Sequence, residues 1–114
     1  MAAPSACCRS SYAASDGFSS TAPVASFTPN RAGIHDLGGN VSEWCHDYYD
    51  TFVGSLKKVR RDPTGPKRGQ FHVVRGSSWR HGSITELRLS YRDYTKTPRN
   101  DLGFRVARYV DIPK

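Results

Sequence analysis

Apolar and polar residues alternate along several short stretches of this chain, and turn-forming residues bound most of them. Successive side chains of a strand point to opposite faces, so the alternation predicts strands that turn one face towards a core. The last stretch is expected to place Phe104 and Val106 on one face and Arg105 on the other. The predicted strands cover residues 24–27, 40–44, 71–76 and 102–109, and residues 90–92 are expected to be extended.

Helical periodicity is weak throughout the chain. Residues 82–89 neither alternate nor repeat at helical spacing, so a short helix and a loop are equally compatible with them. Residues 51–69 are rich in Lys, Arg, Gly and Pro and predict a surface excursion with a double turn at residues 62–66. The pattern therefore predicts short strands joined by long loops, with no internal repeat and no long helix.

Length and composition narrow the class of protein. A chain of 114 residues, 37% hydrophobic and 24% charged, fits one globular domain with a modest core. No apolar run approaches the roughly 18 residues of a membrane span, and the start lacks the pattern of a secretion signal. We expect no membrane partner and a cytoplasmic location, with secretion open if a leader has been removed. Residues 1–11 are expected to be a loosely ordered start and residues 12–114 a single domain.

The formal charge of +7 raises the question of nucleic-acid binding. Apart from a cluster at residues 57–61, the basic residues are scattered, and Arg92 and Arg99 stand beside or close to acids. No nucleic-acid-binding motif is present. A solvated basic surface is therefore favoured, and nucleic acid is an unlikely partner.

Three cysteines do not make a disulfide framework. Cys7 and Cys8 are adjacent and lack nearby metal-ligating partners, so an inert role is favoured for them. Cys45 follows a tryptophan in a predicted strand and is interpreted as a small buried hydrophobic residue.

The stretch from Gly33 to Trp44 holds the densest candidate chemistry. It places two carboxylates, Asp36 and Glu43, on either side of a turn at residues 38–40. Calcium takes about six to eight oxygen ligands and mixes carboxylates with backbone carbonyls, so this arrangement suits it. The alternative is a plain turn in which the acids cap neighbouring backbone amides. We favour calcium.

Five motifs then occur in one order: residues 36–44 (DLGGNVSEW), 62–66 (DPTGP), 74–79 (VRGSSW), 91–92 (YR) and 103–108 (GFRVAR). Together this series resembles the carboxy-terminal half of the formylglycine-generating enzyme family, also called the sulfatase-modifying-factor domain. The resemblance implies an α+β fold, a truncated variant of the C-type-lectin-like fold, with little regular secondary structure and short, twisted, antiparallel strands. The family's amino-terminal half has no counterpart here.

The resemblance also implies metal ligands. The family's calcium loop falls on the side chains of Asp36 and Glu43 and on the carbonyls of Gly39 and Val41. A second calcium site would use Asp16 and the carbonyl of Phe18 together with an upstream Asn and its neighbour. No Asn precedes Asp16, so this second site is expected to be lost or weakened.

Catalysis in the family depends on two cysteines that bind copper, and the matching positions here hold His81 and Glu86. Neither residue offers the thiolate that Cu(I) prefers, so the resemblance implies neither copper nor formylglycine-generating activity. Zinc or iron at these residues is less favoured than a solvated or hydrogen-bonded histidine, because two ligands make no closed site. Candidate ligand-binding residues are Trp79, Arg80, His81, Glu86 and Arg88.

Arg88, together with Arg92 and Arg105, is also compatible with structural ion pairs or stacking on nearby tyrosines, and this is the favoured interpretation.

Three functions remain open from the sequence. The first is a non-catalytic or diverged member of the family that acts as a calcium-stabilised binding module for an unknown ligand. The second is an enzyme of different oxidative chemistry on the same fold. The third is a truncated fragment that self-associates as a homo-oligomer, because a partial domain leaves strand edges and apolar surface uncovered.

Overall fold

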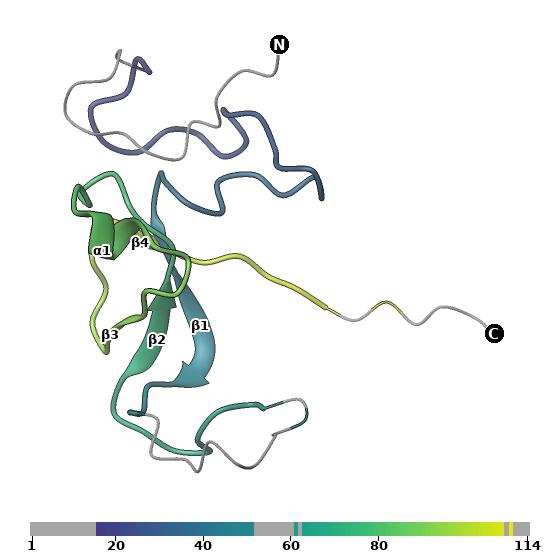
Figure 1. Cartoon of the computed structure of the whole chain (residues 1–114), viewed down its shortest axis with the longest axis vertical. Helices are drawn as coiled ribbons and strands as arrows, with labels where there is room; N and C mark the ends of the chain where they lie inside the picture. Colours follow the sequence, from purple (N-terminus) through teal and green to yellow (C-terminus); the bar gives the residue numbers. More distant parts are fainter. Residues whose placement is uncertain (1–15, 52–60, 62, 109, 111–114) are drawn as a thin grey trace.

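The computed structural model describes residues 16–51, 61, 63–108 and 110 of the chain. Its centre is a four-stranded sheet with the strand order β3-β2-β1-β4 (Figure 1). One short helix, α1, lies beside the sheet. The elements are β1 (Ser42–Tyr48), β2 (His72–Arg75), α1 (Ile84–Leu87), β3 (Asp93–Thr95) and β4 (Leu102–Gly103).

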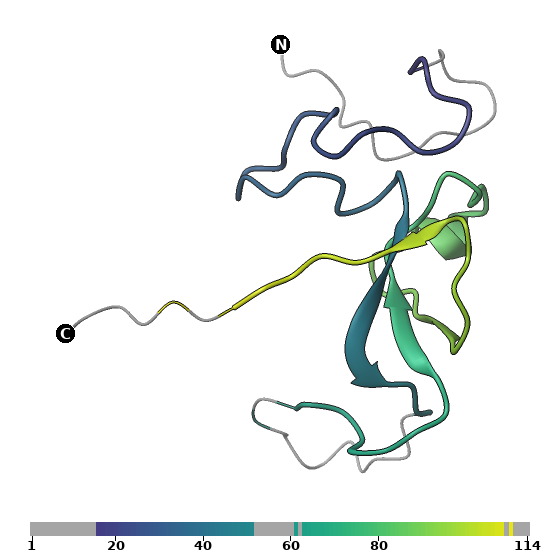
Figure 2. The ribbon, with the colours of Figure 1, turned by 180° about the vertical axis from the view of Figure 1, so that it is seen from behind.

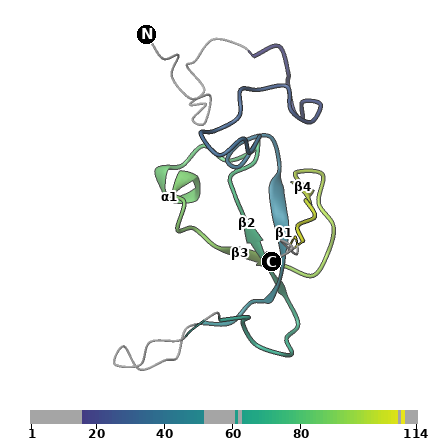
Figure 3. The same ribbon diagram turned by 90° about the vertical axis from the view of Figure 1, so that its right-hand side faces the viewer.

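The sheet is mixed, which corrects the expectation of antiparallel strands. β2 pairs antiparallel with both β1 and β3, whereas β1 pairs parallel with β4. The parallel pair arises because the chain crosses from β3 back to the far side of β1 before β4 begins. Residues 16–40 lie over one end of this sheet and contribute no strand (Figure 3).

The apolar core is small and centres on β2. Val73 is 6% exposed and Val74 is 1% exposed, since β2 has a neighbouring strand on each side. The buried hydroxyl groups of Ser42 and Ser78 beside this core are hydrogen-bonded. The Ser42 hydroxyl donates to the Gly76 carbonyl at 2.9 Å, and the Ser78 hydroxyl donates to the Asp101 carboxylate at 3.0 Å.

Two of the predicted strands are confirmed with adjusted ends. The prediction for residues 40–44 corresponds to β1, which begins two residues later because residues 36–40 form the turn that precedes it. The prediction for residues 71–76 corresponds to β2, which Gly76 ends with a φ of 79°. Such a backbone favours glycine, and a Cβ there would meet the Leu37 carbonyl at 3.2 Å.

Residues 82–89, which were equally compatible with a short helix and a loop, contain the short helix α1. Ser83 caps α1, and Glu86 returns a hydrogen bond to the Ser83 backbone, which completes a capping box. Sequence reading missed this box because α1 is only four residues long.

One strand prediction was wrong, one was displaced, and one was confirmed only at its first two residues. Residues 24–27 form a turn instead, with a hydrogen bond from the Ser26 backbone to the Pro23 carbonyl at 3.2 Å and a φ of 61° at Ala25. The extended segment falls at β3, just after the predicted residues 90–92. The last strand stops at Gly103, and Phe104 and Val106, which were expected to face the core, are 75% and 88% exposed.

Other predictions concern residues outside the described ranges. They are the loosely ordered start at residues 1–11, the inert role of Cys7 and Cys8, and most of the basic cluster at residues 57–61. Within the described part of the chain, no helix is both long and apolar enough to cross a membrane.

Candidate functional site

A cavity of about 130 Å³ lies where residues 16–40 meet the loop that follows β2. Figure 2 shows these two segments facing each other at one end of the sheet. The lining of this cavity is polar and apolar in nearly equal parts, with an aromatic side chain on each wall. The lining residues are Asp16, Phe18, Ser19, Ser20, Ala22, Phe27, Asp36, Gly38, Gly39, Asn40, Ser77, Ser78, Trp79, His81 and Leu87.

Asn40 holds the two walls of the cavity together. Its side-chain amide accepts a hydrogen bond from the Ala22 backbone at 3.0 Å and donates to the Ala22 carbonyl at 3.1 Å. Its own carbonyl accepts from the Trp79 backbone at 2.9 Å, and Gly39 donates to the Ser77 carbonyl at 2.9 Å. The turn fits this role because Asn and Gly tolerate positive φ, which is 59° at Asn40 and 111° at Gly39.

His81 lines the cavity with a defined tautomer. The Ser78 backbone N–H donates to Nδ1 of His81 at 3.0 Å, which assigns the ring hydrogen of the neutral form to Nε2. The lone pair of Nδ1 is therefore used, and Nε2 is left as a donor. A metal would need a free imidazole lone pair, so this geometry favours a hydrogen-bonding role over metal ligation.

Trp79 is the other predicted ligand residue that lines the cavity, and it is 39% exposed. Arg80 does not line it. Its guanidinium lies 5.8 Å from the centre of the Trp79 ring and donates to the Asn100 side chain at 3.4 Å. Arg80 thus supports Trp79 from outside.

Glu86 and Arg88 also lie outside the cavity lining. The Ser83 hydroxyl donates to the Glu86 carboxylate at 2.6 Å, and this hydrogen bond lowers the pKa of Glu86. Arg88 ends α1 and is exposed. The two positions that match the family's cysteines therefore differ in role: His81 faces the cavity and Glu86 caps a helix.

Two carboxylates of the predicted calcium sites, those of Asp16 and Asp36, line the cavity and already accept hydrogen bonds. Asp16 accepts from the Phe18 backbone at 2.9 Å, and Asp36 accepts from the Ala25 backbone at 3.2 Å. Phe18 packs edge-on against Phe27, with ring centres 6.2 Å apart. Asp16 and Phe18 thus belong to the same cavity as Asp36.

Glu43 binds Arg105 through both carboxylate oxygens. The same guanidinium donates to the carbonyls of His35 at 3.0 Å and Asp36 at 3.3 Å. The hydrogen bond to Glu43 raises the pKa of Arg105. The oxygens near the loop thus converge on a cation, which confirms Arg105 as a structural ion-pair partner.

The donor set still fits calcium chemically. A carboxylate has about four acceptor sites, so Glu43 can bind Arg105 and a cation together, and Asp36 uses only one oxygen for Ala25. Across the described part of the chain, no three His, Cys, Asp or Glu residues cluster as a ready metal site. Calcium would therefore depend on the backbone carbonyls of Gly39 and Val41 in addition to these two acids.

The one cysteine in the described ranges, Cys45, lies on β1 and is absent from the cavity lining. Burial raises the pKa of its thiol, although the charge of Arg75 partly opposes this. Cys45 is half-buried, so the prediction of a small buried hydrophobic residue is met only in part.

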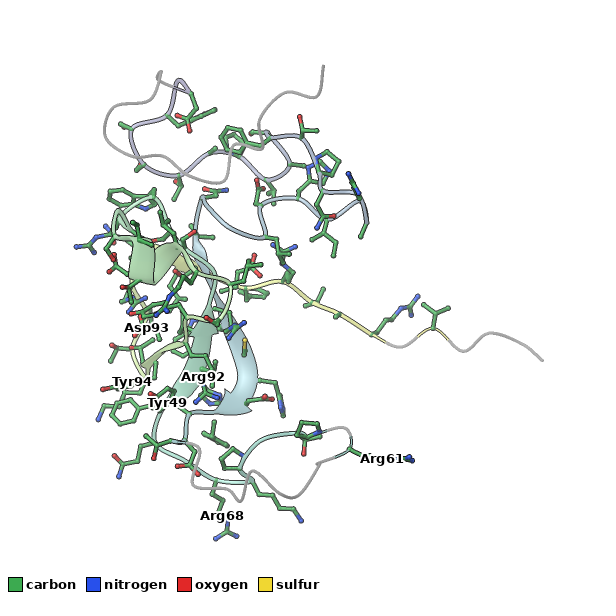
Figure 4. All side chains as sticks on the ribbon, in the orientation of Figure 1. Tyr49, Arg61, Arg68, Arg92, Asp93 and Tyr94 are labelled. Atoms are coloured by element: carbon green, nitrogen blue, oxygen red, sulfur yellow. The ribbon has the colours of Figure 1, made fainter. Side chains whose placement is uncertain are left out.

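Arg92 and its aromatic neighbours lie at the other end of the sheet (Figure 4). The Arg92 guanidinium is 5.2 Å from the centre of the Tyr49 ring and donates to the Asp50 carbonyl at 2.7 Å. Tyr49 in turn packs on Tyr94, with ring centres 4.3 Å apart. The stacking interpretation of Arg92 is confirmed.

Comparison with known proteins gives a consistent set of relatives. The family profile of the sulfatase-modifying factor enzyme 1-like domain matches residues 3–110. The formylglycine-generating enzyme of Streptomyces coelicolor is 40% identical over 105 residues, which cover 87% of this chain and 32% of that protein. The inactive C-alpha-formylglycine-generating enzyme 2 of Mus musculus is 32% identical over 108 residues, covering 89% of this chain and 30% of that protein.

Solved structures resemble the fold as well. Treponema denticola variable protein 1 superposes with a TM-score of 0.64 at 34% identity, over 75% of this chain and 31% of that one. PvdO from Pseudomonas aeruginosa gives a TM-score of 0.61 at 30% identity, over 82% of this chain and 36% of that one. The chain thus spans about a third of the length of these relatives.

Proposed function

The chain belongs to the family of sulfatase-modifying factor enzyme 1-like domains, and from that membership we propose that it is a binding module without the family's oxidase activity. The observation that carries the proposal is the state of His81, which stands where the resemblance places a catalytic cysteine. Its Nδ1 accepts a backbone hydrogen bond, so Nε2 carries the ring hydrogen, and His81 lines the cavity. A relative whose name describes it as inactive shows that the family includes such members.

The cavity favours a small hydroxyl-bearing ligand. At about 130 Å³ it is smaller than the roughly 300 Å³ lower bound for sites that take drug-sized molecules. The carboxylates of Asp16 and Asp36 would accept hydrogen bonds from hydroxyl groups, His81 Nε2 would donate one, and Trp79 offers an apolar ring. One sugar ring has both hydroxyl groups and a flat apolar face, and a C-type-lectin-like variant of the fold would hold it on loops above a rigid sheet.

We expect a monosaccharide panel to change the fluorescence of Trp79 in a saturable way. His81→Leu should weaken binding about tenfold, because the ligand loses a hydrogen bond in a partly buried site. Titration calorimetry on the same proteins gives the dissociation constants, and thermal melts check that the variant is folded.

Arg88→Gln is the matched control, because Arg88 was predicted from the sequence to bind ligand yet lies outside the lining. It should bind like the unmodified chain. Equal weakening of binding by both substitutions would contradict the proposal that the ligand binds in the cavity. Oxidation of a cysteine-containing peptide in the presence of Cu(I) would contradict the absence of oxidase activity.

Calcium is proposed as a stabiliser of the loop at residues 36–43. Support comes from the chemistry of its donors, the carboxylates of Asp36 and Glu43 and the carbonyls of Gly39 and Val41. Positive φ values of 52° at Asp36 and 111° at Gly39 turn the loop sharply.

Chelation is expected to lower the thermal midpoint of unfolding. A ligand of the folded state stabilises it by about 1.4 kcal/mol when its free concentration is about ten times the dissociation constant. The measurement is a melt with calcium and with excess chelator. Asp36→Ala should remove the shift, whereas Asp50→Ala, at an exposed acid, should keep it. An unchanged midpoint for the unmodified chain would exclude the site.

A further inference from the structure

The carboxylate of Asp101 lies outside the cavity lining, yet hydrogen bonds join it to His81 through one residue, Ser78. Asp101 is 3% exposed and Ser78 is 4% exposed. Burying a carboxylate is costly unless it is paired or hydrogen-bonded, so its partners are the groups to which its burial is coupled. For Asp101 these partners lead in one direction to the sheet and in the other to the cavity.

The sheet holds Asp101 in place. The backbone N–H of Ser42, the first residue of β1, donates to the Asp101 carbonyl at 2.9 Å. The side chain divides its two oxygens: Oδ1 accepts from Arg99 Nε at 3.2 Å, and Oδ2 accepts from the Ser78 hydroxyl at 3.0 Å. One oxygen therefore serves a cation and the other the loop that follows β2.

Ser78 closes a turn over residues 78–81. Its carbonyl accepts from the His81 backbone N–H at 3.0 Å, and its hydroxyl oxygen accepts from the Arg80 backbone N–H at 3.4 Å. The hydrogen of the same hydroxyl goes to Asp101, and a bond to a charged acceptor is roughly twice as strong as one between neutral groups. The carboxylate thus fixes the orientation of the hydroxyl and leaves its lone pairs for the turn.

His81 depends on Ser78 for its orientation. Within the described structure both hydrogen bonds of His81 end at Ser78: its backbone N–H donates to the Ser78 carbonyl, and its Nδ1 accepts from the Ser78 N–H at 3.0 Å. A neutral imidazole has one donor nitrogen and one acceptor nitrogen, so an N–H aimed at Nδ1 selects the tautomer with the hydrogen on Nε2. Tyr91 packs edge-on against the ring, with ring centres 6.4 Å apart.

We propose that Asp101 is a positioning residue for His81. Through the Ser78 hydroxyl it holds the turn in which the Ser78 N–H points at Nδ1 of His81, and it thereby keeps the ring hydrogen on Nε2. Asp101 itself neither lines the cavity nor bonds to His81. The use of this tautomer in ligand binding rests on the proposed function, whereas the tautomer itself is measured without a ligand.

Nuclear magnetic resonance of the chain labelled with ¹⁵N at histidine tests the role of Asp101. The two ring nitrogens of His81 give separate resonances for a bare and a protonated nitrogen at about pH 8.5, where imidazole side chains are neutral. The unmodified chain should show a bare Nδ1 and a protonated Nε2. In Ser78→Ala and Asp101→Ala the two shifts should move towards each other, because both tautomers become populated. The His81→Leu variant assigns the signals, and thermal melts check folding.

Arg99→Gln is the matched control. It breaks the ion pairs of Arg99 with Asp93 and Asp101 and should lower stability, but it leaves the bond between Ser78 and Asp101 in place, so the tautomer should not change. An equal change in this control would overturn the proposal, because the tautomer would then follow stability alone. An unchanged tautomer in folded Ser78→Ala would overturn it too, because the backbone bonds that tie the neighbours of Ser78 to the turn at residues 38–40 would then suffice.

Titration of the same variants with the monosaccharide panel separates this proposal from the proposed ligand. Ser78→Ala should weaken binding by up to about tenfold, as His81→Leu does, and Arg99→Gln should bind like the unmodified chain. A tautomer that changes in Ser78→Ala, with no monosaccharide bound by the unmodified chain, would support the positioning role and contradict the proposed ligand. Monosaccharide binding with an unchanged tautomer in Ser78→Ala would support the ligand and overturn the positioning role.

Discussion

Replacing Asp101 with alanine is expected to lower the free energy of unfolding by about 3 kcal/mol. Asp101 is 3% exposed, and its carboxylate accepts from the Ser78 hydroxyl at 3.0 Å and from Arg99 Nε at 3.2 Å. Arg99 also donates to Asp93 at 2.7 Å, so the pair joins the turn before β4 to β3. Alanine would leave the buried Ser78 hydroxyl and the guanidinium without this acceptor. The expected loss in the free energy of unfolding lies at the lower end of the range for a broken buried ion pair, because the Arg99 side chain is 29% exposed.

Urea denaturation followed by tryptophan fluorescence measures this loss. Asp50→Ala removes an exposed acid and should change the stability by less than about 0.5 kcal/mol. Equal effects of the two substitutions would show that the contacts of Asp101 contribute nothing beyond its charge.

Asp101 also makes the stability of the folded state depend on pH in the acid range. Burial raises the pKa of Asp101, but the hydrogen bond from Ser78 and the charge of Arg99 outweigh it, and the net pKa is lowered. A carboxyl group with a lower pKa in the folded state stabilises that state at pH values above its unfolded pKa of about 3.9. This stabilisation should disappear as the pH falls from about 4 through the lower folded pKa. Asp101→Asn should show a weaker loss of stability over that acid range.

The local sequence pattern was sufficient to predict β1 and β2, the two central strands of the sheet. The alternation in residues 40–44 and the strand-forming run that Gly76 ends located β1 and β2. The ordered series of motifs located the family and marked Trp79 and His81, which line the cavity.

Two features that the sequence pattern did not predict depend on contacts between residues far apart in the chain. The sequence identifies Asn40 only as a turn residue. In the folded chain its side-chain amide bonds to the Ala22 backbone and so joins the two walls of the cavity. The strand pattern of residues 102–109 is sound locally, yet Arg105 pairs with Glu43, 62 positions away, and the chain diverges there. Neither partner could be identified from spacing along the chain.

Val74→Ala is expected to lower the free energy of unfolding by about 2 kcal/mol, because it deletes buried methyl groups and leaves a cavity. Val74 is 1% exposed in the central strand β2, and only Val73 joins it as a buried apolar residue within the described ranges. Small domains have only about 5 kcal/mol of stability to lose, so the effect on the fraction of folded chain should be large.

The control is the same substitution at an exposed site. Val24→Ala, at a residue that is 90% exposed, should shift the urea midpoint by little. A small effect at Val74 would mean that hydrogen bonds such as those of Ser42, Ser78 and Asp101, rather than apolar burial, hold the sheet. A large effect would show that apolar burial on β2 also supports the site, since the loop with Trp79 and His81 begins where that strand ends.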